Sequence, residues 1–312
     1  MISTRQFLIS PVIGALVCGL FIAEAAGQGR DRSNPKTLTL GIVAEFNRSL
    51  VADHFTDFVR YLAAKLDSGP DIEGKVVVAP TPFQLARLID QNRVDFYMES
   101  PYPTHLVNNV HGVAKLLLRR WKGGLAEYRS LIFCKKNGEI NRLEDLGGKV
   151  FVFEDPESTS GHFLPKHFLT RRGFKFTDKS RYDPFALPTD VGYLFAGSQA
   201  KVVDWVLSQK AAAGAFSDDD YTRLDEKKKS EIVILAETER LPRHLVSVRN
   251  DFSPALTHRL EQILLSMHEN DQGQRILKKT DDTTKFDRLP EGDAGLRRRL
   301  KEVFRSSEKK SR

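Results

Sequence analysis

The sequence has few of the residues that anchor metals and disulfide bridges. Only two cysteines, Cys18 and Cys134, occur among 312 residues, and no Cys/His group has the spacing of a zinc site. No P-loop is present, and no HExxH or GxSxG arrangement organises the eight histidines. The chain also has no internal repeat and no low-complexity block. These absences argue against an enzyme, and we expect neither a metal nor a cofactor.

The positive charge of the chain gathers at its carboxyl end. Residues 297–312 hold eight Lys/Arg against Glu302 and Glu308, which accounts for +6 of the net charge of +7. No nucleic-acid-binding motif accompanies this charge, so no nucleic-acid partner is expected. We interpret the segment from about residue 297 onward as a basic tail exposed to solvent.

The N-terminal residues have the pattern of a secretory signal peptide. A basic residue precedes an uncharged apolar run over residues 7–23, and small residues follow at cleavage spacing. We therefore expect residues 1–26 to be removed on export, and the alternative is an uncleaved membrane anchor. Cys18 leaves with this segment. The remaining Cys134, in the apolar run SLIFC, is expected to be a buried thiol without a disulfide.

Strand and helix patterns alternate along the first part of the remaining chain. Apolar runs at residues 37–46, 75–79 and 94–98 predict buried strands. Apolar residues at helical spacing predict a helix over residues 53–66, and Thr81-Pro82 opens a second helix. The order β-α-β-α-β predicts a mostly parallel sheet covered by helices.

The alternation restarts near residue 129. We expect further strands within residues 129–136, 149–155, 211–216, 231–237 and 245–249, and further helices after Ser158, over residues 198–209 and from Ser253 onward. Two successive α/β units indicate two lobes, and the last long helix is expected to return to the first lobe. The predicted lobes are residues 36–128 together with 247–312, and residues 129–246. A ligand cleft is expected between them.

The most distinctive stretch is DPESTSG, residues 155–161, which follows the apolar run VFVF. A helix that starts here has first N–H groups without partners inside the helix, and its dipole adds positive charge. The Ser and Thr hydroxyl groups add donors, and the glycine leaves room for a ligand. Together they form a binding site for an oxyanion that needs no Lys or Arg. Plain N-capping by Ser158 or Thr159 is the other explanation. Pro165 predicts that the helix is kinked or restarted one turn later.

DPESTSG, with the apolar pair and Pro165 after it, resembles the phosphonate-binding proteins, which are solute receptors of ABC importers for phosphate, phosphite and phosphonates. LTLGIVAEF, VDFYMESPYPTHLV, EYRSLIFCKK and LVSVRNDFSPAL are similar to other segments of that family, so the resemblance covers most of the mature chain. It implies an α/β, two-lobed periplasmic-binding-protein-like fold of type II. It further implies a periplasmic protein that binds a phosphonate- or phosphate-like oxyanion by lobe closure and delivers it to an ABC permease in the inner membrane. We expect a monomer.

By this resemblance the oxyanion ligands in the second lobe are Ser158, Thr159, Ser160 and Gly161. The hypothesis predicts that Thr159→Ala weakens ligand binding while the melting temperature of the free protein stays nearly unchanged. Ser198 stands where the family often has a ligand-binding histidine, and Asp218 is a candidate partner for a ligand amine. The second carboxylate of such amine sites has no counterpart near His244, which puts amine recognition in doubt.

The first lobe offers Glu99, Ser100 and Tyr102 at the end of its third strand. Ser100 and Tyr102 carry hydroxyls that can donate to an oxyanion. A carboxylate at Glu99 repels a dianion unless it is protonated, paired with an arginine such as Arg48, or facing a cationic group of the ligand. The remaining interpretation is an exposed Glu99 outside the pocket.

Two other functions stay open at this point. The first is a ligand-sensing clamp that reports a small molecule to a membrane signalling partner. The second is a receptor of the same fold for a ligand that is not a phosphonate. Both use the same two-lobed architecture, so the sequence alone does not separate them from an import receptor.

Overall fold

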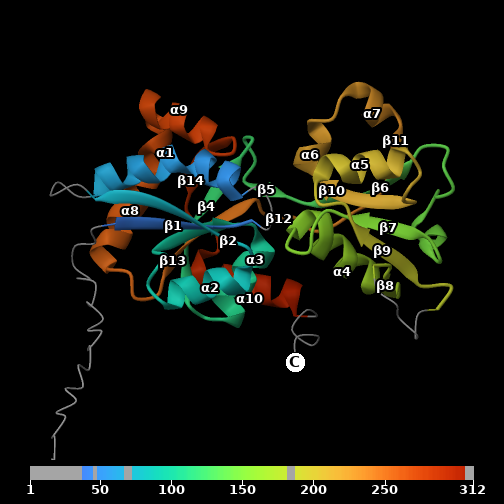
Figure 1. Ribbon diagram of the computed structural model, residues 1–312, viewed down its shortest axis with the longest axis horizontal. Helices are drawn as coiled ribbons and strands as arrows, with labels where there is room; N and C mark the ends of the chain where they lie inside the picture. Colours follow the sequence, from blue (N-terminus) through green and yellow to red (C-terminus); the bar gives the residue numbers. More distant parts are fainter. Residues whose placement is uncertain (1–36, 45–47, 67–71, 181–186, 306–312) are drawn as a thin grey trace, which may run out of the picture. The chain divides into compact units, whose positions relative to one another are not determined.

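The computed structural model describes residues 37–44, 48–66, 72–180 and 187–305 (Figure 1). The predicted signal peptide, residues 1–26, and the end of the basic tail, residues 306–312, lie outside these ranges. Within the described ranges, no helix combines the length and the apolar character needed to cross a membrane.

Two six-stranded sheets and one two-stranded sheet organise the described residues. The strands are β1 Thr37–Val43, β2 Glu73–Ala79, β3 Phe96–Glu99, β4 Ala114–Lys122, β5 Glu127–Tyr128, β6 Ser130–Lys135, β7 Val150–Phe153, β8 Phe176–Asp178, β9 Val191–Phe195, β10 Ala213–Ser217, β11 Ile232–Glu237, β12 Leu241–Pro242, β13 His244–Arg249 and β14 Thr283–Asp287. The α-helices are α1 Arg48–Leu66, α2 Pro82–Asp90, α3 Pro101–His105, α4 Leu164–Thr170, α5 Gln199–Leu207, α6 Asp218–Thr222, α7 Glu226–Ser230, α8 Pro254–Ser266, α9 Asp271–Lys279 and α10 Gly292–Phe304. The other helical turns are η1 Leu106–Val110, η2 Leu143–Leu146, η3 Thr159–Phe163 and η4 Met267–Glu269.

The first sheet has the strand order β14-β4-β13-β3-β1-β2. β1 pairs in parallel with both β2 and β3, which confirms the predicted β-α-β-α-β unit. β13 enters between β3 and β4 and runs antiparallel to both. Helix α1 covers one face of this sheet and α2 the other (Figure 1). Because both faces are covered, the strands are nearly continuous apolar runs rather than alternating ones.

Helix α1 packs on the sheet through the apolar face that its sequence predicts. The buried residues of this face are Phe55, Phe58, Val59, Leu62, Ala63 and Leu66. Their spacing of three and four residues puts them on one side of a 3.6-residue helix. At the start of α2, the Thr81 hydroxyl accepts the N–H of Gln84 at 3.2 Å and Pro82 takes the first helical position, also as predicted.

The second sheet has the strand order β11-β6-β10-β7-β9-β8. Its central strand β10 is rich in small residues, and a Cβ at Gly214 would approach Val202 of α5 to 2.9 Å. The small residues therefore let α5 pack close to the sheet. Cys134 lies in β6 with 1% of its surface exposed and without a disulfide, as predicted, and its thiol donates to the Ile140 carbonyl at 3.2 Å.

The chain passes between the two large sheets twice. The first passage contains β5 and the second contains β12, and these two strands pair antiparallel, Tyr128 opposite Leu241. The N–H of Arg243 extends the pairing to the Ala126 carbonyl at 2.8 Å. After the second passage, β13 joins the first sheet and helix α8 packs into its core. The boundaries of the two lobes remain a prediction.

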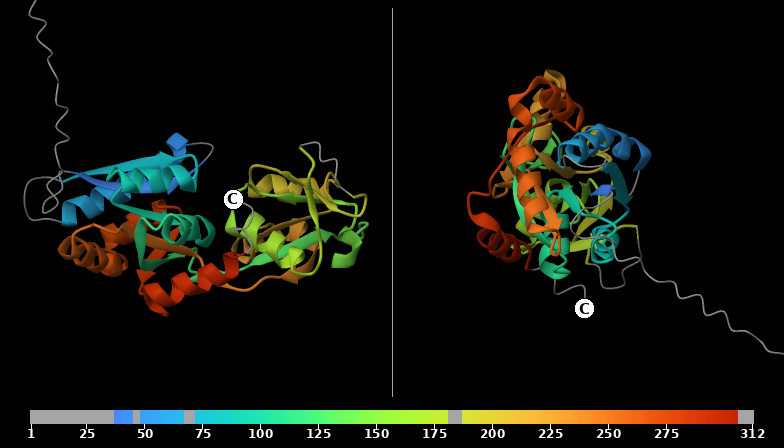
Figure 2. Two further views of the ribbon diagram at one scale, coloured as in Figure 1. Left: turned by 90° about the horizontal axis from the view of Figure 1, so that it is seen from below. Right: turned by 90° about the vertical axis from the view of Figure 1, so that its left-hand side faces the viewer.

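The predicted solvent-exposed tail is wrong for residues 297–304. These residues belong to α10, drawn in red in Figure 2, which packs beside α3. The physical reason is an apolar stripe at helical spacing, which the many charges conceal: Leu296, Leu300, Val303 and Phe304 are all buried. The Arg297 guanidinium donates to the Asn108 carbonyl at 2.7 Å, so its charge anchors the helix.

Candidate ligand-binding site

A cavity of about 260 Å³ lies where the carboxyl ends of β3 and β7 meet. In parallel α/β sheets the loops after the strands are the usual place for ligands. Glu99 ends β3, and the DPESTSG turn follows β7. The full lining is Val43, Glu99, Ser100, Pro103, Lys122, Tyr128, Glu154, Asp155, Glu157, Ser158, Thr159, Ser160, Asp220, Arg243 and His244. The structure therefore brings together five of the nine residues that the sequence singled out: Glu99, Ser100, Ser158, Thr159 and Ser160.

Ser158 acts as the cap of the helical segment that follows it. Its hydroxyl accepts the N–H of Gly161 at 2.9 Å and donates to Oε2 of Glu154 at 2.8 Å. Plain N-capping, one of the two explanations open from the sequence, therefore accounts for this hydroxyl. The capped segment begins as the π-helical turn η3, with the N–H of Phe163 bonded to the Ser158 carbonyl at 3.0 Å.

Pro165 explains why the helix restarts after this turn. In a regular α-helix its missing N–H would leave the Gly161 carbonyl without a donor. That carbonyl instead accepts the N–H of Glu154 at 3.1 Å, and Pro165 sits in the first turn of α4. The sequence prediction of a kinked or restarted helix is thus confirmed as a π-helical turn followed by an α-helix.

Gly161 is needed for a different reason from the one its sequence context indicates. A Cβ at this position would lie 2.6 Å from both Cβ and Oε2 of Glu154, and 2.8 Å from the Ser158 hydroxyl. The missing side chain thus makes room for Glu154 and not for a ligand. Gly161 itself is buried and does not line the cavity.

We expect Gly161→Ala to lower the free energy of unfolding by about 1–3 kcal/mol, the usual range for overpacking, and to weaken ligand binding by displacing Glu154 and Ser158. Urea unfolding and calorimetric titration measure the two effects. Gly147→Ala is the matched control, because the nearest atom to its added Cβ is the Thr189 carbonyl oxygen at 3.5 Å, an ordinary contact. Equal stability of the two variants would contradict the packing explanation.

Thr159 links the second sheet to the first. Its hydroxyl accepts the N–H of Tyr102 at 2.9 Å and donates to the Ser100 hydroxyl at 2.9 Å. Only 1% of Thr159 is exposed. The three residues therefore form one polar contact at the cavity wall, and the hydroxyl of Thr159 has a structural partner on each side.

Glu99 is buried at the cavity wall and is not an exposed residue outside the pocket. Its Oε1 accepts the N–H of Val43 at 2.5 Å. Burial raises the pKa of Glu99 to about 8, against the backbone hydrogen bonds from Val43 and Ser100 that lower it. Arg48, its candidate partner from the sequence, is the exposed first residue of α1 and does not line the cavity.

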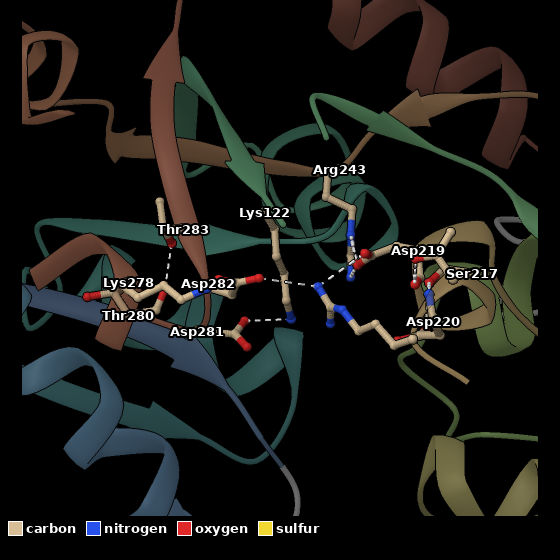
Figure 3. A network of polar contacts seen from close by, with 12 residues as sticks. Lys122, Ser217, Asp219, Asp220, Arg243, Lys278, Thr280, Asp281, Asp282 and Thr283 are labelled. Atoms are coloured by element: carbon tan, nitrogen blue, oxygen red, sulfur yellow. Dashed lines mark hydrogen bonds and ion pairs between the residues drawn. The ribbon is translucent and has the colours of Figure 1, made fainter. Parts of the chain in front are cut away.

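Two cationic side chains face the cavity, and each has a carboxylate partner (Figure 3). Lys122 Nζ lies 2.7 Å from Oδ2 of Asp281. Arg243 donates from Nε and Nη2 to Oδ2 of Asp219, at 3.3 and 3.1 Å, and its guanidinium lies over the Tyr128 ring at 4.5 Å. Burial lowers the pKa of Lys122. The cavity lining thus holds two paired cationic side chains beside its hydroxyl groups and its acidic residues.

His244 completes this side of the cavity as a neutral ring. Burial, together with the charges of Arg120, Arg243 and Lys122, holds the pKa of His244 well below its usual range. A neutral imidazole has one donor and one acceptor nitrogen, so it can serve as a hydrogen-bond partner without adding charge.

Glu154 is a site residue that the sequence analysis did not single out. It follows β7 directly and receives the Ser158 hydroxyl. Burial and the neighbouring Asp155 raise the pKa of Glu154 to about 7. The signal available in the sequence is its place at the end of an apolar strand, like that of Glu99 at the end of β3.

Four predicted site residues lie outside the cavity lining. Tyr102 stacks on Phe163 with ring centroids 4.5 Å apart, and Gly161 is enclosed as described above. Ser198 caps α5 by accepting the N–H of Lys201 at 3.5 Å. Asp218 pairs with Arg240 at 3.2 Å, and the neighbouring Asp220 lines the cavity in its place. No group of three or more potential metal ligands occurs among the described residues.

Comparison with known proteins gives one family and several similar structures. A family model described as the periplasmic substrate-binding protein of phosphonate ABC transporters matches residues 40–291. The XAC2383 protein of Xanthomonas citri bound to ATP is 27% identical, with a TM-score of 0.76 over 88% of this chain and 98% of that one. The same protein bound to chloride ion is 26% identical, with a TM-score of 0.78 over the same shares. PhnD1 from Prochlorococcus marinus in complex with methylphosphonate is 18% identical, with a TM-score of 0.65 over 88% of this chain and 100% of that one. The predicted two-lobed fold of type II is confirmed.

Proposed function

Because the chain belongs to the family of periplasmic substrate-binding proteins of phosphonate ABC transporters, we propose that its cavity binds a small phosphonate- or phosphate-like oxyanion. The chain is the solute-binding component of such an importer. It takes a small-molecule ligand, and its partner is a membrane permease. The family is one of binding proteins and not a class of enzymes. A clamp that reports to a signalling partner is not favoured.

One observation supports the proposal most strongly. The turn Ser158–Ser160 lines the same cavity as Lys122 and Arg243. The first N–H groups of a helical segment and the Ser160 hydroxyl group are neutral donors to an anion, whereas the Ser158 hydroxyl donates to Glu154. Lys122 and Arg243 add the positive charge that the turn itself lacks. Chemically, the arrangement suits an anion with several oxygens, each able to accept a hydrogen bond.

The size of the cavity favours a small ligand. Its volume of about 260 Å³ falls just below the roughly 300–1,000 Å³ of pockets for drug-sized molecules. A phosphate, phosphite or methylphosphonate therefore fits better than a nucleotide. ATP, which is bound to the similar Xanthomonas citri protein, belongs in the test as a competing ligand.

Calorimetric titration of the refolded, ligand-free protein tests the proposal with phosphate, phosphite, methylphosphonate, aminoethylphosphonate and ATP. We expect at least one of the small oxyanions to bind with micromolar or tighter affinity. Ser160→Ala removes a hydroxyl at the cavity wall, and its loss should weaken that binding about 10-fold or more. Ser198→Ala is the matched control, since Ser198 caps α5 away from the cavity lining.

The outcomes separate the ligand classes. Binding of ATP alone moves the function to nucleotides. Equal weakening by Ser160→Ala and Ser198→Ala indicates a general loss of structure, and removes Ser160 from the site. No binding of any of the five compounds overturns the oxyanion proposal and leaves the fold unaffected.

Export and oligomeric state are part of the same proposal. Residues 1–26 are a cleaved signal peptide, supported by the apolar run with small residues after it. The mature protein is a monomer that closes its two lobes on the ligand. N-terminal sequencing of the protein recovered from cells tests the cleavage, and light scattering of the purified protein tests the monomer.

A further inference from the structure

Glu99 stands between two cavities. It lines the ligand cavity and also a second cavity of about 230 Å³ behind it, which is enclosed by the ends of β1, β3 and β4 and by α1. Only 8% of Glu99 is exposed. One carboxyl oxygen receives the N–H of Val43, which fixes the side chain with its carboxyl group at the cavity wall.

The three cations that line the two cavities with Glu99 are paired with other carboxylates. Arg120 Nη2 lies 3.2 Å from Oδ2 of Asp281, and Lys122 Nζ lies 2.7 Å from the same oxygen. Arg243 is held by Asp219. Among the described residues, none of the ion pairs within 4 Å involves Glu99.

The titratable groups around Glu99 act on it from a distance, and of them only the charge of Arg120 is among the causes that lower its pKa. The groups that line the two cavities with it are Arg120 and Lys122 of β4, Asp281 before β14, His54 of α1, Tyr128 of β5, His244 of β13, Arg243 before it, Glu154 after β7, Asp155 and Glu157 in the turn that follows, and Asp220 of α6. His244 is neutral, and Glu157 acts on Glu99 as a like charge.

A buried carboxyl without a cation of its own favours its neutral form, because the charged form loses its hydration without compensation. The rise in the pKa of Glu99 to about 8 agrees with this geometry. A protonated carboxyl has an O–H donor in addition to the oxygen that accepts from Val43.

We propose that Glu99 faces the ligand as a neutral carboxylic acid and donates its O–H hydrogen bond to an oxygen of the bound oxyanion. This inference rests on the proposed function, since it takes the cavity to be the oxyanion site. As a carboxylate, Glu99 would repel the oxyanion, whereas the neutral acid donates a hydrogen bond to it. The affinity for the oxyanion therefore depends on pH. Above the pKa of Glu99 the ionised carboxylate repels the anion, and binding is progressively lost.

The first experiment measures the protonation of Glu99 without any ligand. In protein labelled with ¹³C at the glutamate carboxyl carbons, NMR follows each carboxyl against pH, and the signal missing in Glu99→Gln assigns Glu99. We expect a midpoint near 8. A midpoint near the ordinary glutamate value of about 4.3 overturns the proposal whatever the ligand is.

The second experiment compares binding of inorganic phosphate and methylphosphonate to the wild type and to Glu99→Gln between pH 6.5 and 9.5. Gln keeps the shape and an N–H donor but does not titrate. Titration of the ligand itself cancels in the ratio of the two affinities. We expect the two proteins to agree within about 3-fold at pH 6.5. By pH 9.5, about 1.5 units above the expected midpoint, the wild type should lose about 30-fold relative to Glu99→Gln.

A third protein, Glu99→Met, separates donation from mere removal of charge. It keeps the volume of the side chain and has no donor, so we expect it to bind at least 10-fold more weakly than Glu99→Gln at every pH. Equal binding by the Met and Gln variants overturns the hydrogen bond. A large loss in Glu99→Gln already at pH 6.5 indicates instead an ionised Glu99 that accepts a hydrogen bond from the ligand, and also overturns the proposal.

The two experiments also separate this proposal from the proposed function. If the midpoint lies near 8 but the wild type binds neither these two anions nor the other small oxyanions tested above, the oxyanion function is overturned and with it the hydrogen bond to an anion, while the protonation of Glu99 holds. If the anions bind but the midpoint of Glu99 lies near 4.3, the oxyanion function holds and the proposal of a neutral Glu99 is overturned.

Discussion

Asp219→Asn is expected to lower the free energy of unfolding by about 3–5 kcal/mol, the range for breaking a buried ion pair by removing one charge. Asp219 has 2% of its surface exposed and Arg243 has 7%. Oδ2 of Asp219 accepts from Arg243, and its Oδ1 lies 3.1 Å from Nη2 of Arg223. The substitution keeps the shape and leaves the Arg243 guanidinium buried without a counter-charge. Urea unfolding near neutral pH measures the loss.

Asp218→Asn is the matched control in the same turn. Asp218 pairs with Arg129 and Arg240, whose side chains are 30% and 46% exposed, and an exposed pair contributes about 0–1 kcal/mol. The amide oxygen that replaces its carboxylate can still accept the N–H of Arg129. If both variants unfold at the same urea concentration, the buried pair does not stabilise the fold.

The loss in Asp219→Asn should extend to ligand binding. Arg243 lines the cavity, and Asp219 holds its guanidinium against the Tyr128 ring. Nη2 of Arg223 also lies 3.6 Å from Oδ2 of Asp282, so the ion pairs around Asp219 connect α6, beside the second sheet, with the loop before β14 of the first sheet. Without Asp219 the Arg243 guanidinium is less well positioned to donate hydrogen bonds to the bound anion.

Thr159→Val is expected to lower the free energy of unfolding by about 1–3 kcal/mol and to weaken ligand binding at the same time. Valine has the shape of threonine without its hydroxyl, so the N–H of Tyr102 and the hydroxyl of Ser100 lose their common partner in a buried place. This prediction differs from the sequence-based expectation that Thr159→Ala leaves the melting temperature nearly unchanged. Thermal unfolding and calorimetric titration measure the two effects.

Thr159→Ser is the control for this prediction, because serine keeps the hydroxyl and removes only the methyl group. We expect it to retain both hydrogen bonds and most of the affinity. If the valine variant melts at the temperature of the wild type, the contact between Thr159 and Ser100 is not formed in solution. If the serine variant binds as weakly as valine, the methyl group and not the hydroxyl matters.

The elements with a local pattern could be predicted from the sequence. The apolar face of α1 follows from a spacing of three and four residues, and the start of α2 from Thr81 and Pro82. The interrupted helix after Ser158 follows from Pro165. In each case neighbours along the chain determine the structure, so no knowledge of the distant fold is required.

The cationic side of the cavity could not be predicted in the same way. Lys122 ends a strand and Arg243 follows another, more than a hundred residues apart in the sequence. Only the antiparallel pairing of β4 with β13, together with the two passages of the chain, brings them to one place. The sequence does not show which side of the short helix α6 faces the cavity, so it does not distinguish Asp218 from Asp220 as the cavity residue.

The role of Glu99 was left open by the sequence among several interpretations. Position at a strand end predicts that a side chain lies near a ligand, but not whether a cation reaches it. The answer depends on Asp281, which lies far along the chain and occupies Arg120 and Lys122. The charge of a buried group is thus a property of the whole arrangement and not of its own segment.

The strand order has a consequence for the route by which the chain reaches this structure. The second large sheet is made entirely from residues 130–237, so it can form as soon as that one stretch is available. The first sheet starts with β1 near the N-terminus but needs β13 and β14, the last strand ending at Asp287. Pairings between such distant segments form slowly. The first sheet, whose strands begin the chain, is therefore completed last. Until β13 and β14 are in place, the apolar side chains of β1 and β3 are exposed and need protection from aggregation.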